Sequence, residues 1–547
     1  MRGCGFCAFL ILFLQPCARA QDHRDWSHNL GIYEVNVRQY TPEGTFNEFQ
    51  EHLDRLQEMG AGILWFMPIH PIGIQNRLGS LGSYYSVRDY LDVNPEYGTL
   101  EDFRTLVQEI HERGMHVILD WVANHTSWDN PLTVEHPEWY VHDGQGNFIP
   151  PPGTNWSDVI ELDYSEQGLR DYMIDAMKFW ALDMDVDGFR CDAVESVPVD
   201  FCEEAIAALR TAKAGLFLLA EADGPQWHQA GFDATYGWGL YGFGRGIFKQ
   251  LADGAGNAAG LSSYSAGEKS LYTAEAYRMY FTSNHDENSW YGTTGELFGN
   301  AAGCFAVITA TLGGIPLIYS GQEAGLDKRL RFFDKDTIEW ADHADADLYK
   351  KLLHLKKENR ALWNGDRGGP LQRILSSDNS SVYAFIREKD GDRVFVVLNL
   401  SDQERDVALK GTSISGMYRN VFSGDTAVFN GGDSLTLEAW GYRIFDAIEA
   451  SAAGSSTVSP VSFRLGQNFP NPFNSSAKIS YSLGSSASIR LTLFDLSGRE
   501  LRILDSGFRQ SGLHTVGLDA ADMTSGVYLY RLQAGHHSET KRLLVLP

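Results

Sequence analysis

Cysteine is scarce in this chain. Six of the 547 residues are cysteine, and three of those six fall within the first twenty positions. The other three are an odd number without a CxxC pair, namely Cys191, Cys202 and Cys304. This pattern excludes a disulfide framework and a cysteine-based metal site, and it leaves at least one thiol free.

Positive charge is also in short supply. Lys and Arg number 45 against 71 Asp and Glu, which gives a formal net charge of -26. A nucleic-acid-binding surface needs a basic face for the phosphates, and anionic lipid selects for the same charge. The sequence therefore predicts neither kind of partner. A neutral polar substrate, such as a sugar, is compatible with this charge.

Long hydrophobic runs are missing too. The strongest run, FCAFLILFL at residues 6–14, is too short to cross a bilayer. It follows Arg2 and precedes Ala18-Arg19-Ala20, so residues 1–20 are predicted to be a cleaved signal peptide. A lipoprotein signal ending at Cys17 is the alternative, although Gln and Pro fit poorly just before a lipidated cysteine. We expect a secreted or cell-surface protein without a transmembrane segment.

Short apolar runs are what the chain does have. The hydrophobic share of 43% is that of a globular protein, and the length suggests several domains. Amphipathic segments such as residues 46–59 and 100–113 separate the runs, and Gly60 and Gly114 are expected to cap these two helices. Eight alternations predict a (β/α)8 TIM barrel, with a doubly wound sheet as the alternative. The eight runs are residues 31–37, 62–67, 115–122, 186–191, 216–220, 232–236, 278–282 and 315–319.

Three features indicate further parts. The stretch 126–163 after the third run is too long for a loop, so we expect a small inserted domain there. Beyond residue 365 the period changes to that of strands, at residues 382–387, 393–398, 435–437 and 442–445. The predicted organisation is a barrel at 21–365, a β-sandwich at 366–449, a Ser- and Gly-rich linker at 450–460 and an all-β domain at 461–547.

Polar side chains follow four of the predicted strands. They are DWVANH at residues 120–125, GFRCD at 188–192, Glu221, and NHD at 284–286. One acidic residue after a strand is more often a turn or cap residue than a functional one. In a (β/α)8 barrel, however, all strands end at the same face, where active sites are built. Four coinciding strand ends therefore favour a site.

The residue types at these ends suit cleavage of a glycosidic bond. Arg190 lies two positions before Asp192, so both side chains leave the strand on one side, and the guanidinium is expected to keep Asp192 ionised as a nucleophile. Glu221 follows an apolar run, and burial is expected to raise its pKa so that it stays protonated as a general acid. Two carboxyl groups with divided roles are the requirement for glycoside hydrolysis.

At this point the chain resembles a known family. The segments LDWVANH (119–125), DGFRCD (187–192), LLAEAD (218–223) and FTSNHDEN (281–288) resemble, in order, the four sequence regions of the α-amylase superfamily of glycoside hydrolases. The resemblance covers about residues 26–448. It implies a catalytic barrel with an insertion after the third strand, a β-sandwich behind it, and activity on α-glucans such as starch or maltodextrin.

The resemblance also implies roles for individual residues. It places the nucleophile at Asp192, the general acid/base at Glu221 and a third carboxylate, which grips the hydroxyls of the sugar ring, at Asp286. It further implies substrate-binding or orienting roles for Tyr85, His125, Arg190 and His285. No organic cofactor is implied.

One departure concerns calcium. Where many α-amylases carry Lys-His after the nucleophile, this chain has Val194-Glu195-Ser196, which puts the usual leaving-group contacts and part of the usual calcium site in doubt. Asn124 and Asp163 still match calcium-ligand positions of the family, and oxygen ligands suit this ion. The alternative is two ordinary turn residues.

The end of the chain carries a second resemblance. FRLGQNFPNPF at residues 463–473 and GVYLYR at 526–531 resemble the C-terminal sorting domain of the type IX secretion system. This implies export across an outer membrane, with the secretion machinery as a partner and the tail removed or attached to the surface. A plain β-sandwich accessory or sugar-binding module is the alternative.

The sequence therefore predicts a secreted retaining glycoside hydrolase of α-1,4-glucans. A transglycosylase or isomerase of small α-glucosides uses the same intermediate and stays open. A barrel that only binds glucan is disfavoured because all three carboxylates are present. In the retaining scheme we expect the carboxyls of Asp192 and Glu221 about 5–5.5 Å apart, with a low pKa for Asp192 and a higher one for Glu221.

Overall fold

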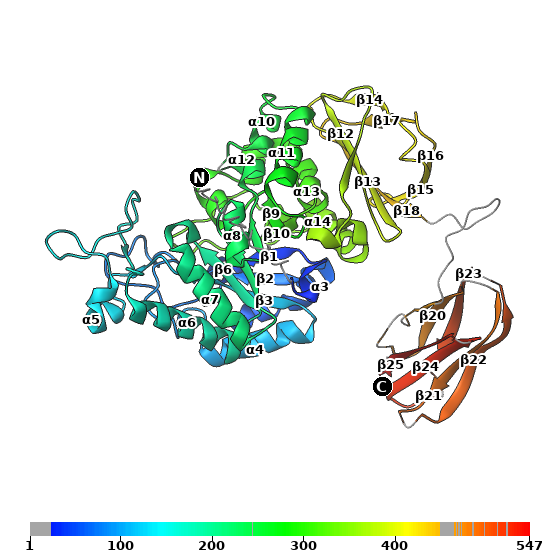
Figure 1. Cartoon of the computed structure of the whole chain (residues 1–547), viewed down its shortest axis with the longest axis horizontal. Coiled ribbons are helices and arrows are strands. Elements are labelled where there is room, and N and C mark those ends of the chain that lie inside the picture. The colour runs from blue at the N-terminus through cyan, green and yellow to red at the C-terminus, as the bar shows by residue number, and fades with distance from the viewer. Residues whose placement is uncertain are drawn as a thin grey trace, which may run out of the picture. The chain divides into compact units, whose positions relative to one another are not determined.

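The computed structural model describes residues 23–242, 244–448 and 464–546, apart from residues 467, 469–470, 472, 484–485, 497, 511, 521–522 and 536. The predicted signal peptide and linker lie outside the described residues. The chain divides into two compact units, Met1–Glu449 and Ala450–Pro547 (Figure 1). The domain limits given above remain predictions.

Eight parallel strands of the first unit form a closed barrel, in the order β1-β2-β3-β6-β7-β8-β9-β10. Each strand overlaps one of the eight predicted runs, so the predicted barrel is confirmed. The strands are β1 (Ile32–Val35), β2 (Ile63–Phe66), β3 (His116–Val122), β6 (Gly188–Asp192), β7 (Phe217–Ala220), β8 (Ala234–Tyr236), β9 (Tyr277–Phe281) and β10 (Ile315–Tyr319).

Helices surround this barrel (Figure 1). Because they cover its outer face, both faces of each strand are buried, which explains why the strands read as nearly continuous apolar runs. Including α5, which belongs to the insertion, the α-helices of the first unit are α1 (Val37–Tyr40), α2 (Phe46–Gln50), α3 (Leu53–Met59), α4 (Leu100–Glu112), α5 (Leu132–Glu135), α6 (Gln167–Leu182), α7 (Val199–Ala212), α8 (Pro225–Ala230), α9 (Trp238–Tyr241), α10 (Ile247–Ala252), α11 (Ala258–Leu271), α12 (Thr294–Phe298), α13 (Ala302–Thr311) and α14 (Ala344–Glu358).

Local sequence signals fix the ends of two of these helices. Thr99 and Asp102 form a capping box at the start of α4, and Gly114 follows its C-cap with a positive φ of 71°. Gly60 ends α3 with a φ of 94°, as predicted. The single helix expected over residues 46–59 is instead two short helices, α2 and α3, separated by a turn at Glu51 and His52.

The long stretch after β3 has its own small sheet. β4 (His125–Ser127) pairs antiparallel with β5 (Val159–Glu161), and α5 lies between them in the chain. In Figure 1 the segment reaches out from the barrel on one side, beside α6. The pairing of β4 with β5 begins directly where β3 ends, so the insertion lies at the face of the barrel that carries the strand ends.

Antiparallel sheets follow the barrel. The first has the order β11-β12-β13-β18-β15-β16 and the second pairs β14 with β17. Successive side chains of β12 point to opposite faces of the sheet and so enter two different cores. Tyr383 and Phe385 pack with the barrel, whereas Val382 and Ile386 pack inside the sandwich. The strands are β11 (Leu371–Ile374), β12 (Val382–Lys389), β13 (Asp392–Asn399), β14 (Arg405–Ala408), β15 (Gly416–Asn420), β16 (Thr426–Phe429), β17 (Ser434–Leu437) and β18 (Tyr442–Ile448).

The second unit is also all β, as predicted. It has its own buried core, which includes Leu491, Tyr530 and Leu532. Its sheets are β19-β20-β23 and β22-β21-β24-β25. The strands are β19 (Arg464–Leu465), β20 (Ser476–Leu483), β21 (Ala487–Phe494), β22 (Glu500–Arg509), β23 (Gly512–Asp519), β24 (Gly526–Ala534) and β25 (His537–Val545). No helix found within the described part of the chain has the length and apolarity needed to cross a membrane.

Candidate active site

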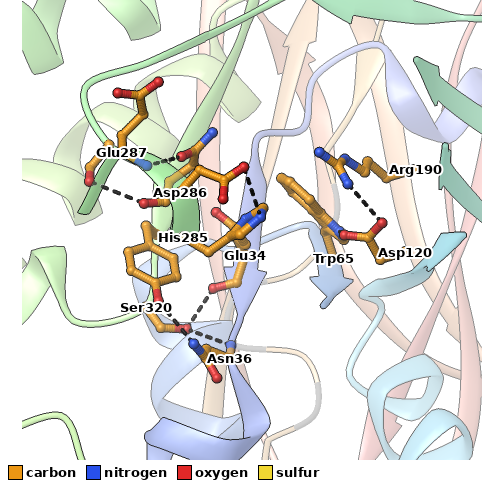
Figure 2. Close-up of polar contacts among 12 residues, drawn as sticks. Glu34, Asn36, Trp65, Asp120, Arg190, His285, Asp286, Glu287 and Ser320 are labelled. Carbon is orange, nitrogen blue, oxygen red and sulfur yellow. Dashed lines mark hydrogen bonds and ion pairs between the residues drawn. The ribbon is translucent and has the colours of Figure 1, made fainter. Parts of the chain in front are cut away.

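Polar side chains from most strands of the barrel meet at one end (Figure 2). Parallel register places Asp120 of β3 beside Arg190 of β6, and Glu34 of β1 beside Trp65 of β2. The Trp65 ring contacts both Arg190 and His285. Arg190 Cζ lies 5.0 Å from the centroid of the Trp65 ring, and the His285 ring centroid lies 5.9 Å from it in an edge-on arrangement. The site therefore has two halves, one around Arg190 and one around His285.

Arg190 is the centre of the first half. Its side chain has no exposed surface, and its Nη1 lies 2.8 Å from Asp120 Oδ1 and 2.7 Å from Asp192 Oδ1. Its Nη2 lies 2.9 Å from Glu221 Oε1, and its Nε donates to Tyr236 Oη at 3.1 Å. A guanidinium stays charged at any ordinary pH. One buried cation therefore holds three carboxylates, and it contacts Asp192 as the two-residue spacing predicts.

Burial dominates the protonation of this half. Desolvation raises the pKa of Asp192 to about 6, even though Arg190 opposes the shift. Desolvation also raises the pKa of Glu221 to about 7, with the charges of Asp192 and Asp286 adding to it. The expectation of a low pKa for Asp192 is therefore wrong, since Arg190 is shared among three carboxylates and does not offset burial. The pKa of Glu221 is raised by burial, as expected.

Glu221 has a second anchor besides Arg190. The backbone N–H of Ala193 donates to Glu221 Oε2 at 2.8 Å. Ala193 directly follows Asp192 and has a φ of 43°, in the left-handed region that residues other than glycine rarely adopt. The conformation at Ala193 therefore ties the position of Glu221 to the end of the strand that carries Asp192.

His285 is the centre of the second half. Its Nδ1 lies 2.5 Å from Glu34 Oε1, and its Nε2 lies 2.7 Å from Tyr85 Oη and 3.3 Å from Asp286 Oδ2. Burial opposes the charged imidazolium, but Asp286 and Glu34 outweigh it and hold the pKa of His285 well above its usual value. His285 in turn lowers the pKa of Asp286 against the effect of burial. Asp286 is therefore ionised.

Tyr85 and Asp120 join the two halves. Tyr85 Oη donates to Asp120 Oδ2 at 3.0 Å, and Trp65 Nε1 donates to the same oxygen at 3.1 Å. The other oxygen of Asp120 contacts Arg190. The Tyr85 ring is stacked on the imidazole of His285, with centroids 5.4 Å apart. Tyr85, predicted to face a sugar ring, thus lies within the cluster and is 8% exposed.

His125 lies on β4 at the entrance to the insertion. It is buried, and burial lowers its pKa to about 4, so the ring is neutral at neutral pH. The ring centroid lies 5.4 Å from that of Trp156, which is 40% exposed. Trp290, 50% exposed, donates its indole N–H to Asp286 Oδ1 at 3.2 Å. Aromatic side chains thus adjoin the cluster and face solvent.

The two candidate calcium ligands, Asn124 and Asp163, lie near each other in the fold. Leu162 N–H donates to the carbonyl of Asn124, which brings Asp163 near it. The amide of Asn124 contacts His125 Nδ1, and Asp163 Oδ1 accepts the N–H of Ser165. Within the described ranges no group of three or more His, Cys, Asp or Glu is placed to hold a metal ion. Asn124 and Asp163 alone do not complete a calcium site, which usually takes six to eight oxygen ligands.

Sequence reasoning gave no role to several members of the cluster. Glu34 and Asp120 each stand inside an otherwise apolar strand, IYEV and HVILDWV. A charge inside a strand that is buried on both faces is costly unless it is paired, so its presence is a signal that was available. Trp65 and Tyr236 carried no such signal, because aromatic residues are common in buried strands.

Comparison with known proteins supports this description. Residues 21–230 match the family described as "Alpha amylase, catalytic domain", and residues 372–444 match "Maltogenic Amylase, C-terminal domain". Residues 467–546 match "Secretion system C-terminal sorting domain". The three matches follow the order of the barrel, the β-sandwich and the second unit.

Similar individual proteins extend the comparison. A solved maltogenic α-amylase from Thermotoga neapolitana is 30% identical with a TM-score of 0.70, covering 77% of this chain and 99% of that one. An α-amylase from Lactobacillus plantarum is 31% identical with a TM-score of 0.69, covering 77% of this chain and all of that one. The α-amylase MalA of Haloarcula japonica is 28% identical over 441 residues, and this chain spans 62% of its length. The chain therefore belongs to the α-amylase family of glycoside hydrolases and ends in a C-terminal sorting domain.

Proposed function

We propose that the chain is a retaining hydrolase of α-1,4-glucosidic bonds, with Asp192 as nucleophile and Glu221 as general acid/base. The observation that carries the proposal is the guanidinium of Arg190, which contacts both carboxylates with separate nitrogens. Burial raises both pKa values into the neutral range, so the pair can share one proton, and a protonated Glu221 beside an ionised Asp192 is the division of roles that glycosidases need.

In the first step Asp192 attacks the anomeric carbon of the sugar as the bond to the leaving oxygen breaks. Glu221 gives its proton to that oxygen, so the leaving chain departs as a neutral alcohol. An ester between the sugar and Asp192 remains. Positive charge develops on the ring in the transition state, and the carboxylates held by Arg190 favour it.

In the second step water cleaves this ester. Glu221, now ionised, takes a proton from the water, and the water oxygen bonds to the anomeric carbon while Asp192 leaves as a carboxylate. The proton is restored to Glu221 and the anomeric configuration is retained. Separations of about 5–5.5 Å between the two carboxyl groups characterise this scheme, and we propose that separation for Asp192 and Glu221.

Asp286 and His285 are proposed to bind the sugar ring beside the reacting carbon. Asp286 is ionised. Its Oδ1 accepts a hydrogen bond from the indole of Trp290, and its Oδ2 lies against the imidazolium of His285. Asp286 accepts from sugar hydroxyls with the lone pairs that its present contacts leave, and Nε2 of His285 donates to a hydroxyl by exchanging its contact with Tyr85 or Asp286. Tyr85 and His125 are proposed to add an aromatic face and a neutral imidazole to the same subsite.

Starch, maltodextrin or a related α-glucan is the proposed substrate class. α-Amylases of 28% and 31% identity support it, and a cyclomaltodextrinase of a Bacillus species is 25% identical over 415 residues. Transfer to a sugar in place of water is the second candidate, because a cyclomaltodextrin glucanotransferase from Bacillus sp. is 26% identical over 452 residues. Both outcomes pass through the same ester at Asp192.

Product analysis tests the proposal. Purified enzyme is incubated with starch and with maltooligosaccharides, and the products are followed by chromatography and the first anomer by NMR. Shorter chains of α configuration are expected. Products longer than the starting maltooligosaccharide would favour transfer over hydrolysis, and a β-configured first product would contradict the assigned roles.

Export through the C-terminal unit is proposed as well. The match of residues 467–546 to a sorting domain supports it. In a host with the corresponding machinery, a chain that ends at residue 449 should stay inside the outer membrane while the full chain leaves the cell. Mass spectrometry of the secreted protein should find Gln21 at its start and no residues 1–20. Equal export of the two chains would contradict this proposal.

Calcium binding at Asn124 and Asp163 is proposed from the oxygen donors of these two side chains. A second carboxylate, Glu161, adds a further oxygen donor: burial raises its pKa, and the nearby charge of Asp163 raises it further. An ion that binds only the folded state raises the melting temperature. Melting curves in excess chelator and in added calcium decide the matter, and superimposable curves would remove calcium from the description.

A further inference from the structure

A cavity of about 500 Å3 lies away from the strand ends, between α11, β9 and the start of the antiparallel sheet. Its position is outside the barrel wall, because Arg278 of β9 points to Glu268 of α11. The cluster around Arg190 contributes nothing to its walls. The lining includes Glu268, Lys269, Arg278, Asp366, Arg387 and Lys389, together with Tyr264, Tyr272, Tyr280 and glycines at 313, 365, 368 and 369.

Arg387 is the unusual member of this lining. It is 2% exposed, and its guanidinium donates to the carbonyls of Gly369 at 2.8 Å, Thr311 at 3.2 Å and Trp363 at 3.2 Å. No carboxylate pairs with it among the residues that the structure describes. Arg190 is also buried, but its guanidinium contacts three carboxylates. Burial lowers the pKa of Arg387 to about 10.

A second buried cation lies close to Arg387. Lys356 has no exposed surface, and its Nζ donates to the carbonyls of Gly314 at 3.0 Å and Leu362 at 2.8 Å. Burial and the charge of Arg387 hold its pKa well below the usual value. Carbonyl groups offer partial charges only, and burying a cation without a counter-ion is costly. Lys356 is not one of the residues that line the cavity. At the wall, Arg387 is therefore the buried cation with which no carboxylate pairs among the described residues.

Glycines keep side chains away from this guanidinium. A Cβ on Gly368 would come within 2.5 Å of Arg387 Nη2, and one on Gly313 would lie 3.8 Å from its Cζ. Both glycines line the cavity. Arg387 has five N–H groups and uses three of them on carbonyls, so two N–H groups are left for a ligand.

The remaining charges on the wall do not cancel the charge of Arg387. Glu268 is paired with Arg278 at 2.7 Å, and Arg278 also pairs with Asp223. Lys269 and Lys389 donate to the carbonyls of Leu371 and Asp366, both at 2.9 Å. Four cationic side chains line the cavity with two carboxylates, Glu268 and Asp366, and Asp223 is a third carboxylate that pairs with one of these cations, so an excess of one positive charge remains in a chain whose formal net charge is -26.

We propose that this cavity binds a small oxyanion, held by Arg387 with Lys269 and Lys389 at its rim. The shared chemistry is a phosphate, sulfate or carboxylate group, either as a free ion or on an acidic sugar. Guanidinium groups bind such oxygens in pairs, and the charge-assisted hydrogen bonds are strong. The volume falls within the range of small-molecule sites, and the tyrosines offer room and hydrogen bonds for a sugar.

Isothermal titration of the full chain with inorganic phosphate tests the site, at constant ionic strength. Binding is expected, and Lys269→Gln with Lys389→Gln should weaken it by about tenfold or more, since two charged hydrogen bonds are lost. The matched control, Lys178→Gln with Lys350→Gln, neutralises two lysines that pair with carboxylates elsewhere and should leave binding unchanged. Hydrolysis of maltooligosaccharides should be unaffected in both double variants.

Further arms separate the ligand sources. Arg387→Lys keeps the charge but loses the paired geometry, so it should weaken phosphate binding even where Arg387→Gln fails to fold. Glucose 6-phosphate binding tighter than phosphate would assign an acidic sugar, and equal binding a free ion. No phosphate binding beyond that of chloride, unchanged affinity in the lysine double variant, or equal binding of neutral maltose would each overturn the proposal.

Discussion

Oε1 of Glu34 lies 2.5 Å from Nδ1 of His285, so the first strand of the barrel is joined to the segment that follows β9. The two strands are not neighbours, because β10 lies between them in the barrel. Charged hydrogen bonds of this kind are short and strong, and burial strengthens them further. Glu34 thereby keeps His285 protonated beneath Asp286.

Replacing Glu34 with Gln should reduce activity through His285. The amide still accepts the hydrogen bond but carries no charge, so the pKa of His285 falls. His285 then loses its proton at a lower pH than in the parent protein, and Asp286 loses its ionic partner at that same pH. A hydrogen bond to a charged group contributes about 1.5–3 kcal/mol, which corresponds to a fall in kcat/KM of roughly 10- to 100-fold.

The pH dependence of kcat/KM checks this prediction, and the loss should grow toward alkaline pH. Glu323→Gln is the matched control, since Glu323 is a buried carboxylate that accepts from Tyr33 at 2.6 Å and pairs with Arg55. It should lower stability without changing the pH profile. A Glu34→Gln profile parallel to that of the parent would show a purely structural role.

The pH profile of the parent protein should be bell-shaped, with both limbs set by carboxyl groups whose pKa values burial raises. Asp192, raised to a pKa of about 6, must be ionised, so activity falls below that pH. Glu221, raised to about 7, must be protonated, so activity falls above it. The two limbs report the coupled pair and not isolated groups. Measured kcat/KM should fall on both sides of an optimum, and a profile without an acid limb or without an alkaline limb would contradict the assignment.

The barrel itself was open to prediction from sequence, for a physical reason. Parallel strands under helices are buried on both faces, so their residues read as continuous apolar runs, and all eight were found. The break between α2 and α3 was not, since Glu51 and His52 interrupt the helix without a Gly or Pro. Apolar periodicity carries no information about such a turn.

The site was predictable where motifs place a residue after a strand, as for Asp192, Glu221 and Asp286. Its electrostatics were not, because they depend on partners from distant strands. Arg190 was expected to serve Asp192, but it also contacts Asp120 and Glu221, and burial then prevails. Which cations go unpaired, as Arg387 does, depends on packing that no single segment encodes.

The raised carboxyl pKa values predict a cost in stability. The folded state binds protons more tightly than the unfolded chain at Asp192, so stability is fully present below the unfolded pKa of about 3.9 and falls as pH rises through about 6. Asp192→Asn removes this penalty. The variant should be more stable than the parent at pH 7, by on the order of 1–3 kcal/mol, and equally stable near pH 4.

Thermal melting of the barrel at both pH values tests this prediction, with Asp286→Asn as a control of opposite sign. The pKa of Asp286 is lowered by His285, so its contribution to stability is present above the unfolded value and is lost as pH falls. Asp286→Asn should therefore lower the melting temperature at pH 7. Two variants that shift in the same direction at pH 7 would contradict the charges assigned to the cluster.

Ala193 makes a different prediction about position. Its left-handed backbone, with a φ of 43°, costs about 1–2 kcal/mol for a residue other than glycine. Ala193→Gly should keep activity, since glycine adopts this conformation and its N–H still donates to Glu221. Ala193→Val should lower kcat about tenfold or more, because a β-branched residue resists positive φ and displaces that N–H.

Steady-state kinetics of the two variants test the role of Ala193. Asp390→Val is the matched control, since Asp390 has a φ of 52° in the turn between β12 and β13, far along the chain from the site. It introduces comparable strain without touching Glu221 and should leave kcat unchanged. Unchanged kcat in Ala193→Val would show that the left-handed backbone at Ala193 is not needed to position Glu221.

The last prediction separates the two carboxylates by the leaving group. Glu221→Gln should slow turnover of maltooligosaccharides by on the order of 10²–10⁴-fold, since the sugar oxygen then leaves without a proton. An aryl or fluoride glycoside needs no such proton, so the ester at Asp192 should form at a rate much closer to that of the parent. Asp192→Asn should lose activity on both substrates, because no ester forms. Near-full activity of Asp192→Asn, or equal losses on both substrates for Glu221→Gln, would show that the roles are assigned wrongly.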